Sequence, residues 1–143
     1  MKILTLLFLT IFMGNGCDSA KAQDIETAII EYTANTRGFY QKITVKNQML
    51  TVSKDRDGND KPVPKKLSDA EWKELVNCFK TVDLDSLSKL KAPSEKRFYD
   101  GAAIANLKIT FKDKAYETTS FDHGFPPKEI KKFVNTVTSL VKE

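Results

Sequence analysis

"AAIANLKITFKDKAYETTSF", residues 102–121, decides the fold of this chain. Apolar residues take every second position of its first half, with Ile104 as the exception, and polar residues lie between them. This period of two predicts a strand over 102–112 with one buried and one solvated face. "KDK" predicts a tight turn, after which "AYETTSF" should return as an antiparallel strand. The apolar set is Ala103, Ala105, Leu107, Ile109 and Phe111, and the polar set is Asn106, Lys108, Thr110 and Lys112.

Two helices are predicted to cover the buried face of this hairpin. In "LSDAEWKELVNCFKTV", residues 67–82, Ser68 and Glu71 have the spacing of a capping box, which marks a helix start. A second helix is expected to start at Pro126 or Pro127, where a missing N–H does no harm. Each carries one apolar stripe at helical spacing: Trp72, Leu75, Val76 and Phe79 in the first, and Ile130, Phe133, Val134, Val137, Leu140 and Val141 in the second.

Three further strands are predicted before the first helix, over residues 25–34, 39–46 and 49–54, joined by short polar turns. Residues 83–90, "DLDSLSKL", are expected to add one or two helical turns, with Asp83 or Asp85 as the cap. Strands and helices are thus partly segregated along the chain. This order predicts an α+β fold, in which an antiparallel sheet of about five strands has two main helices packed on one face. Residues 25–143 are enough for a single domain with one core.

The N-terminus has the pattern of an export signal. Lys2 supplies a positive start, and residues 3–13, "ILTLLFLTIFM", form an apolar run too short to span a bilayer. Small residues follow. We therefore expect residues 1–22 to be a signal peptide and the mature protein to be exported.

Two cleavage sites compete at the end of this leader. Cys17 follows the small residue Gly16, as in a bacterial lipobox, although Gly14 stands where an aliphatic residue is usual. Cleavage there leaves a signal of residues 1–16, an acylated Cys17 and a tether over 17–24, and it anchors the protein to the cell envelope. Cleavage after Ala22 instead gives a soluble periplasmic or secreted protein. Either product leaves Cys78 without a disulfide partner, so Cys78 is expected to pack as a small apolar residue.

Composition argues against several functional classes. The formal net charge is only +4, and the lysines are scattered, so we expect no nucleic-acid partner. The acidic turn "DRDGND", residues 55–60, fails as a calcium loop because Asp60 and Lys66 stand where Gly and Glu are required. The chain has one histidine, His123, which with Cys78 is too few for a zinc site. No metal, catalytic group or cofactor is predicted.

Two loops form a candidate binding rim. "RFYDGA", residues 97–102, leads into the 102–112 strand, and "FDHGFPP", residues 121–127, leaves its antiparallel neighbour, so both loops should lie at the same end of the sheet. Aromatic residues beside arginine and carboxylates are typical of protein-binding hot spots. In the alternative interpretation, Arg97 pairs with Asp122 and the aromatic residues close the sheet edge. The predicted rim is Arg97, Phe98, Tyr99, Asp100, Asp122, His123 and Phe125.

The overall pattern resembles small uncharacterised lipoproteins and secreted proteins of flavobacteria and their relatives in the Bacteroidota. The residues that carry this resemblance are the leader with its cysteine, "TRGFY", "LSDAEW", "APSEKRFYDGA" and "FDHGFPPKEI". The resemblance implies an envelope location and no particular reaction.

We therefore expect a non-enzymatic envelope protein that binds a protein or another envelope macromolecule and meets the membrane through its N-terminal lipid. Two alternatives stay open. One is a small hydrolase or metal-dependent enzyme that uses Asp100, Asp122 and His123. The other is a carrier with a small-ligand pocket between the sheet and the helices.

Overall fold

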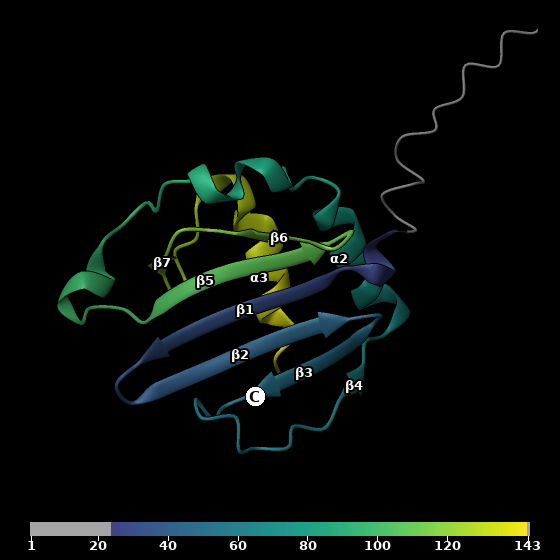
Figure 1. Cartoon of the computed structure of the whole chain (residues 1–143), viewed down its shortest axis with the longest axis horizontal. Helices are drawn as coiled ribbons and strands as arrows, with labels where there is room; N and C mark the ends of the chain where they lie inside the picture. Colours follow the sequence, from purple (N-terminus) through teal and green to yellow (C-terminus); the bar gives the residue numbers. More distant parts are fainter. Residues whose placement is uncertain (1–23, 143) are drawn as a thin grey trace, which may run out of the picture.

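The computed structural model describes residues 24–142. The predicted signal peptide, Cys17, both cleavage sites and most of the tether lie outside these residues. The described chain forms an antiparallel sheet of seven strands in the order β4-β3-β2-β1-β5-β6, with β7 pairing with β5 (Figure 1). The strands are β1 (Ile29–Thr36), β2 (Phe39–Lys46), β3 (Met49–Ser53), β4 (Lys65–Lys66), β5 (Ile104–Phe111), β6 (Lys114–Glu117) and β7 (Phe121–Asp122).

The two main helices are α2 (Asp69–Phe79) and α3 (Lys131–Ser139), and Figure 1 shows both behind the sheet. The capping box of α2 is present, with Glu71 N donating to Ser68 Oγ at 3.2 Å and Ser68 N donating to Glu71 Oε2 at 2.9 Å. The predicted α+β fold is confirmed. Four 3₁₀ segments complete it: η1 (Ile25–Thr27), η2 (Leu84–Lys89), η3 (Lys96–Tyr99) and η4 (Lys128–Ile130), the last of which follows Pro127.

The strand count is higher than predicted because two strands have only two residues each. β4 lies in the segment that follows Pro62 and Pro64, and it pairs with the start of β3. The first strand also lies later than predicted. Residues 25–27 form η1, in which Ala28 N donates to Ile25 O at 3.0 Å, so β1 begins only at Ile29. β1 continues to Thr36, which pairs with Phe39 and leaves a turn of two residues.

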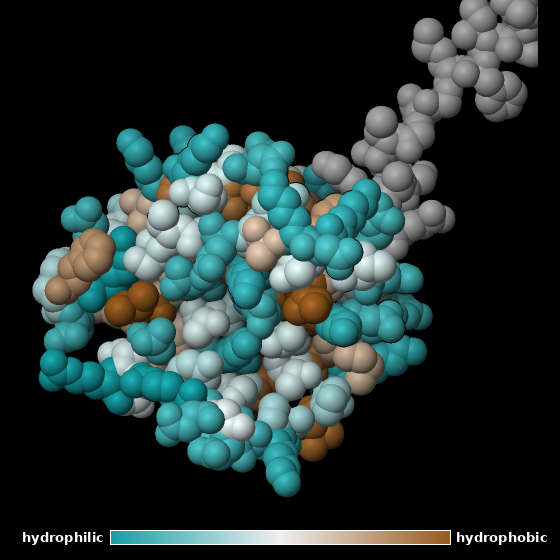
Figure 2. All heavy atoms as spheres, in the orientation of Figure 1, coloured by the Kyte–Doolittle hydropathy of each residue, from teal (hydrophilic) through white to brown (hydrophobic). Residues whose placement is uncertain are grey.

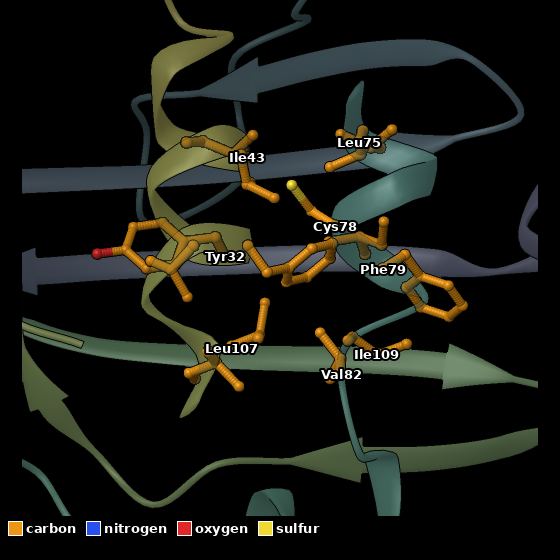
Figure 3. Close-up of a cluster of buried hydrophobic side chains, with 14 of the residues drawn as sticks. Tyr32, Ile43, Leu75, Cys78, Phe79, Val82, Leu107 and Ile109 are labelled. Carbon is orange, nitrogen blue, oxygen red and sulfur yellow. The ribbon is translucent and has the colours of Figure 1, made fainter. Parts of the chain in front are cut away.

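The space between the sheet and the helices is filled by apolar side chains. Figure 3 shows Tyr32, Ile43, Leu107 and Ile109 from the strands facing side chains that come from α2 and the turn after it. Cys78 is one of these and is buried as predicted, 3.5 Å from Thr136 Oγ1. The opposite face of the sheet is largely polar (Figure 2). On this face Glu31 Oε1 lies 2.8 Å from Lys42 Nζ. The core therefore lies on one side of the sheet only.

The predicted strand 115–121 is interrupted. Lys108 pairs with Glu117 and Ala105 with Phe121, so the returning chain has one residue more than β5 over this interval, as in a β-bulge. Thr118 fills the irregularity, because its hydroxyl accepts from Leu107 N at 3.1 Å and its own N–H donates to Leu107 O at 2.9 Å. The extra residue turns Phe121 into the core, where it is completely buried. Without it, the period of two would put Phe121 on the polar face with Glu117.

Within residues 24–142, no helix is long and apolar enough to cross a membrane.

Candidate functional site

The buried carboxylate of Asp122 organises the end of the sheet at which β5 begins. Asp122 lies on β7 and is 0% exposed. Its Oδ2 accepts from Ser94 Oγ at 2.7 Å and Lys96 N at 2.8 Å, and its Oδ1 accepts from Arg97 N at 3.0 Å. Burial alone would raise the pKa of Asp122, but the hydrogen bonds from Ser94, Arg97 and Lys96 outweigh it and lower the pKa to about 2. The carboxylate therefore stays ionised and fastens η3 to β7.

Arg97 is the buried partner of Asp122. Its guanidinium donates to Asp122 Oδ1 at 3.0 Å, to Ser94 O at 2.7 Å and, through Nε, to Ser120 Oγ at 3.0 Å. Only 7% of its side chain is exposed. The ion pair of the alternative interpretation is thus present. Because the guanidinium donates to groups within the protein, Arg97 holds the 94–97 segment against β7.

His123 lies between two aromatic rings. Its Nδ1 is 2.7 Å from Tyr32 Oη, and its ring centroid is 5.7 Å from that of Phe39. In Figure 3 the hydroxyl of Tyr32 points away from the core cluster. Burial raises the pKa of Tyr32 and lowers the pKa of His123, so the phenol stays protonated and the imidazole neutral at pH 7. Tyr32 Oη and His123 Nδ1 are within hydrogen-bond distance, and the tautomer of the imidazole decides which of them donates.

Exposed apolar side chains are concentrated at the end of the sheet where β5 begins. Among residues 24–142, seven large apolar side chains are exposed, and five of them lie at this end of the sheet. We call these five the apolar rim: Phe39 (39% exposed), Phe98 (69%), Tyr99 (71%), Ile104 (41%) and Phe125 (53%). This end of the sheet lies on the left in Figure 1, and Figure 2 shows brown and tan side chains on the same side.

Two cations lie against rim rings. Arg97 Cζ is 4.2 Å from the ring centroid of Phe98, and Lys96 Nζ is 5.3 Å from that of Phe125. Asp100 ends η3 in the left-handed conformation at φ 58° and is exposed. Two rings of the rim, those of Phe98 and Phe125, thus each have a cation beside them.

The structure divides the predicted binding rim into two layers. Phe98, Tyr99, Phe125 and Asp100 are at the surface, His123 is half-buried, and Arg97 and Asp122 lie beneath them. Sequence reasoning missed two surface members, Phe39 and Ile104, and the supporting residues Ser94, Ser120 and Tyr32. Phe39 could have been found, because the hairpin of residues 29–46 brings it to the end of the sheet where β5 begins.

Asp122 and His123, two titratable residues of the predicted rim, are both hydrogen-bonded within the protein. In the described part of the chain, no group of three or more His, Cys, Asp and Glu side chains could hold a metal ion. The carboxylate of Asp122 is already held by several donors, and His123 Nδ1 is held by Tyr32.

Two clefts lie away from the apolar rim. One, of about 490 Å³, is formed by the end of α2, the start of η2 and the β5–β6 turn. The other, of about 470 Å³, is formed by β3, residues 60–65 and the C-terminal residues 140–142. Neither is lined by a rim residue, so the rim stands outside both clefts.

Compared with protein-family models, with curated proteins and with solved structures, the chain gives no match.

Proposed function

We propose that this protein is a non-enzymatic binding module of the cell envelope that recognises a protein partner through the apolar rim. The observation that supports this most is the concentration of Phe98, Tyr99 and Phe125, each more than half exposed, on a loop pair fastened by the buried Asp122. Exposed aromatic residues contribute strongly to protein binding. Because Asp122 holds these loops in place, the exposed residues on them lose less conformational entropy when they bind.

The shape of the rim favours a macromolecule over a small ligand. Small molecules bind in concave sites that bury most of their surface. Three rings of the rim are more than half exposed, and no rim residue lines either of the two clefts described above. Its rings are suited to enter hollows on the surface of a larger partner.

The position of the rim favours a protein over the anchoring membrane. Asp24, where the described chain begins, is 3.1 Å from Lys112 Nζ at the β5–β6 turn. The rim lies at the other end of β1, whose eight residues span about 26 Å. If Cys17 is acylated, as we propose, a tether of seven residues joins the lipid to the end of the domain remote from the rim. The rim is then presented away from the membrane.

Recovery of a partner with matched variants tests this proposal. The full chain with a C-terminal tag is expressed in its native cells, and bound proteins are recovered from the solubilised envelope. We expect a specific protein that is lost with Phe98→Ser/Tyr99→Ser/Phe125→Ser. The control is Met49→Ser, which changes an exposed large apolar side chain outside the rim. The recovered protein is then purified and its affinity for the same variants is measured.

The proposal fails if partner affinity is equal in the rim variant and the control variant. Intact mass spectrometry of the same material tests the export proposal separately. An acylated N-terminus at Cys17 supports lipid anchoring, a start at Gln23 supports a soluble exported protein, and an intact Met1 contradicts both.

A further inference from the structure

The cleft at the β3 edge of the sheet combines an aliphatic lining with a cationic margin. We call it the edge cleft, and its volume is about 470 Å³, within the range of small-ligand sites. It is lined by β3, by residues of the 54–65 segment and by residues 140–142 after α3. Its apolar lining is aliphatic throughout: Leu50, Val52, Pro62, Val63, Leu140 and Val141.

Charge around the edge cleft is unbalanced. Four lysines and one carboxylate line it. That carboxylate, Asp60, already accepts from Ser53 Oγ at 2.7 Å and from Lys54 N at 2.9 Å. Lys142 is 3.1 Å from Glu71. The remaining three lysines make no ion pair with any described residue: Lys54, Lys61 and Lys65.

Val63 is held at the mouth of this cleft. It is 86% exposed, the largest exposed fraction among the large apolar residues of the described chain. Pro62 and Pro64 flank it, and their rings limit the backbone of the segment. An apolar side chain fixed in solvent beside an apolar lining loses little entropy when a ligand covers it.

We infer that the edge cleft binds a single-chain anionic amphiphile, with its alkyl chain on the aliphatic lining and its acidic head group at the lysines. The other cleft suits such a ligand less well. It is partly aromatic, through Phe79, Phe111 and Tyr116, and its Lys114 lies 3.9 Å from Asp85. An acidic peptide is also less well suited, because β4 already covers Met49 and Leu50 of the β3 edge.

Calorimetric titration of the full chain with decanoate tests this inference. Decanoate, 1-decanol and acetate separate the contributions of chain and head group. We expect saturable binding of decanoate at one site, weaker binding of decanol and none of acetate. Lys61→Glu and Val63→Asp should each weaken decanoate binding by roughly tenfold. Lys61→Glu reverses an attracting charge, and Val63→Asp removes apolar contact and adds a carboxylate that repels the head group.

Lys114→Glu is the matched control, since it makes the same charge change in the other cleft, and it should leave decanoate affinity within about twofold. Three results would overturn the inference: no decanoate binding, equal binding by all three variants, or acetate binding as strongly as decanoate. Tighter binding of an acidic leucine-containing peptide, with the same sensitivity to both variants, would also overturn it in favour of a peptide site. None of these outcomes depends on the apolar rim.

Discussion

Arg97 Nη1 lies 3.0 Å from Asp122 Oδ1, and the two side chains are 7% and 0% exposed. Asp122→Ala should lower the free energy of unfolding by about 3–5 kcal/mol, because it leaves the Arg97 guanidinium buried without its counter-ion. Urea unfolding followed by circular dichroism measures this. Asp85→Ala removes a carboxylate from an exposed pair at 3.9 Å and should cost less than about 1 kcal/mol. Equal losses in both variants would contradict the role given to Asp122.

His123 makes stability dependent on pH near neutrality. Burial lowers its pKa in the folded protein below the ordinary value of 6.5. The unfolded chain therefore binds more protons as the pH drops below that value, and the free energy of unfolding should fall between about pH 7 and pH 5. Since the chain has one histidine, proton NMR titration reports this group without ambiguity. A folded-state pKa at or above that of the urea-unfolded chain would show that the burial argument is wrong.

Thr118 stabilises the bulge that turns Phe121 into the core. Thr118→Val keeps the side-chain shape and removes the hydroxyl that accepts from Leu107 N, so a buried donor loses its partner. We expect a loss of about 1–3 kcal/mol in the free energy of unfolding. Thr118→Ser keeps the hydroxyl and should lose less. If the serine variant is the less stable of the two, the missing methyl group matters more than the hydrogen bond.

Two non-glycine residues of the β5–β6 turn have positive φ values, which lowers the stability of the folded protein. Lys112 and Asp113 have φ values of 49° and 61°, the left-handed pair of a type I′ turn. Asp113→Gly should raise the free energy of unfolding by about 0.5–1 kcal/mol, because glycine adopts this conformation without a steric cost. Lys114→Gly, in the adjoining strand, should lower it by a similar amount. Thermal unfolding compares both, and destabilisation by Asp113→Gly would contradict the assignment.

Local chemistry explains what could be predicted of the fold. The capping box of Ser68 and Glu71 and the alternation in residues 39–46 each depend on neighbours in sequence, so both elements were correctly located. The bulge at Thr118 depends on pairing with Leu107, eleven residues away, and alternation in the single strand conceals it. η1 was mistaken for a strand start because Ile25 and Ile29 suit both conformations.

Seven residues of the candidate site were named from the sequence, but their division into surface and buried residues was not predicted. Pairing of the hairpin ends brings the two loops together, and this follows from the sequence. The burial of their side chains does not follow from the sequence, because Asp122 is hydrogen-bonded to Ser94, which lies 28 residues earlier in the chain. Charged residues in a loop are usually exposed, so nothing local marks Arg97 as buried.

The most direct test of the proposed function is photo-crosslinking in the native envelope. A photoreactive phenylalanine is placed at Phe98, Tyr99 or Phe125, and at Met49 as the control. The proposal predicts one shared crosslinked protein from the three rim positions and none from Met49. Crosslinking to that protein from Met49 as strongly as from the rim, or no crosslinked protein from any rim position, would contradict it.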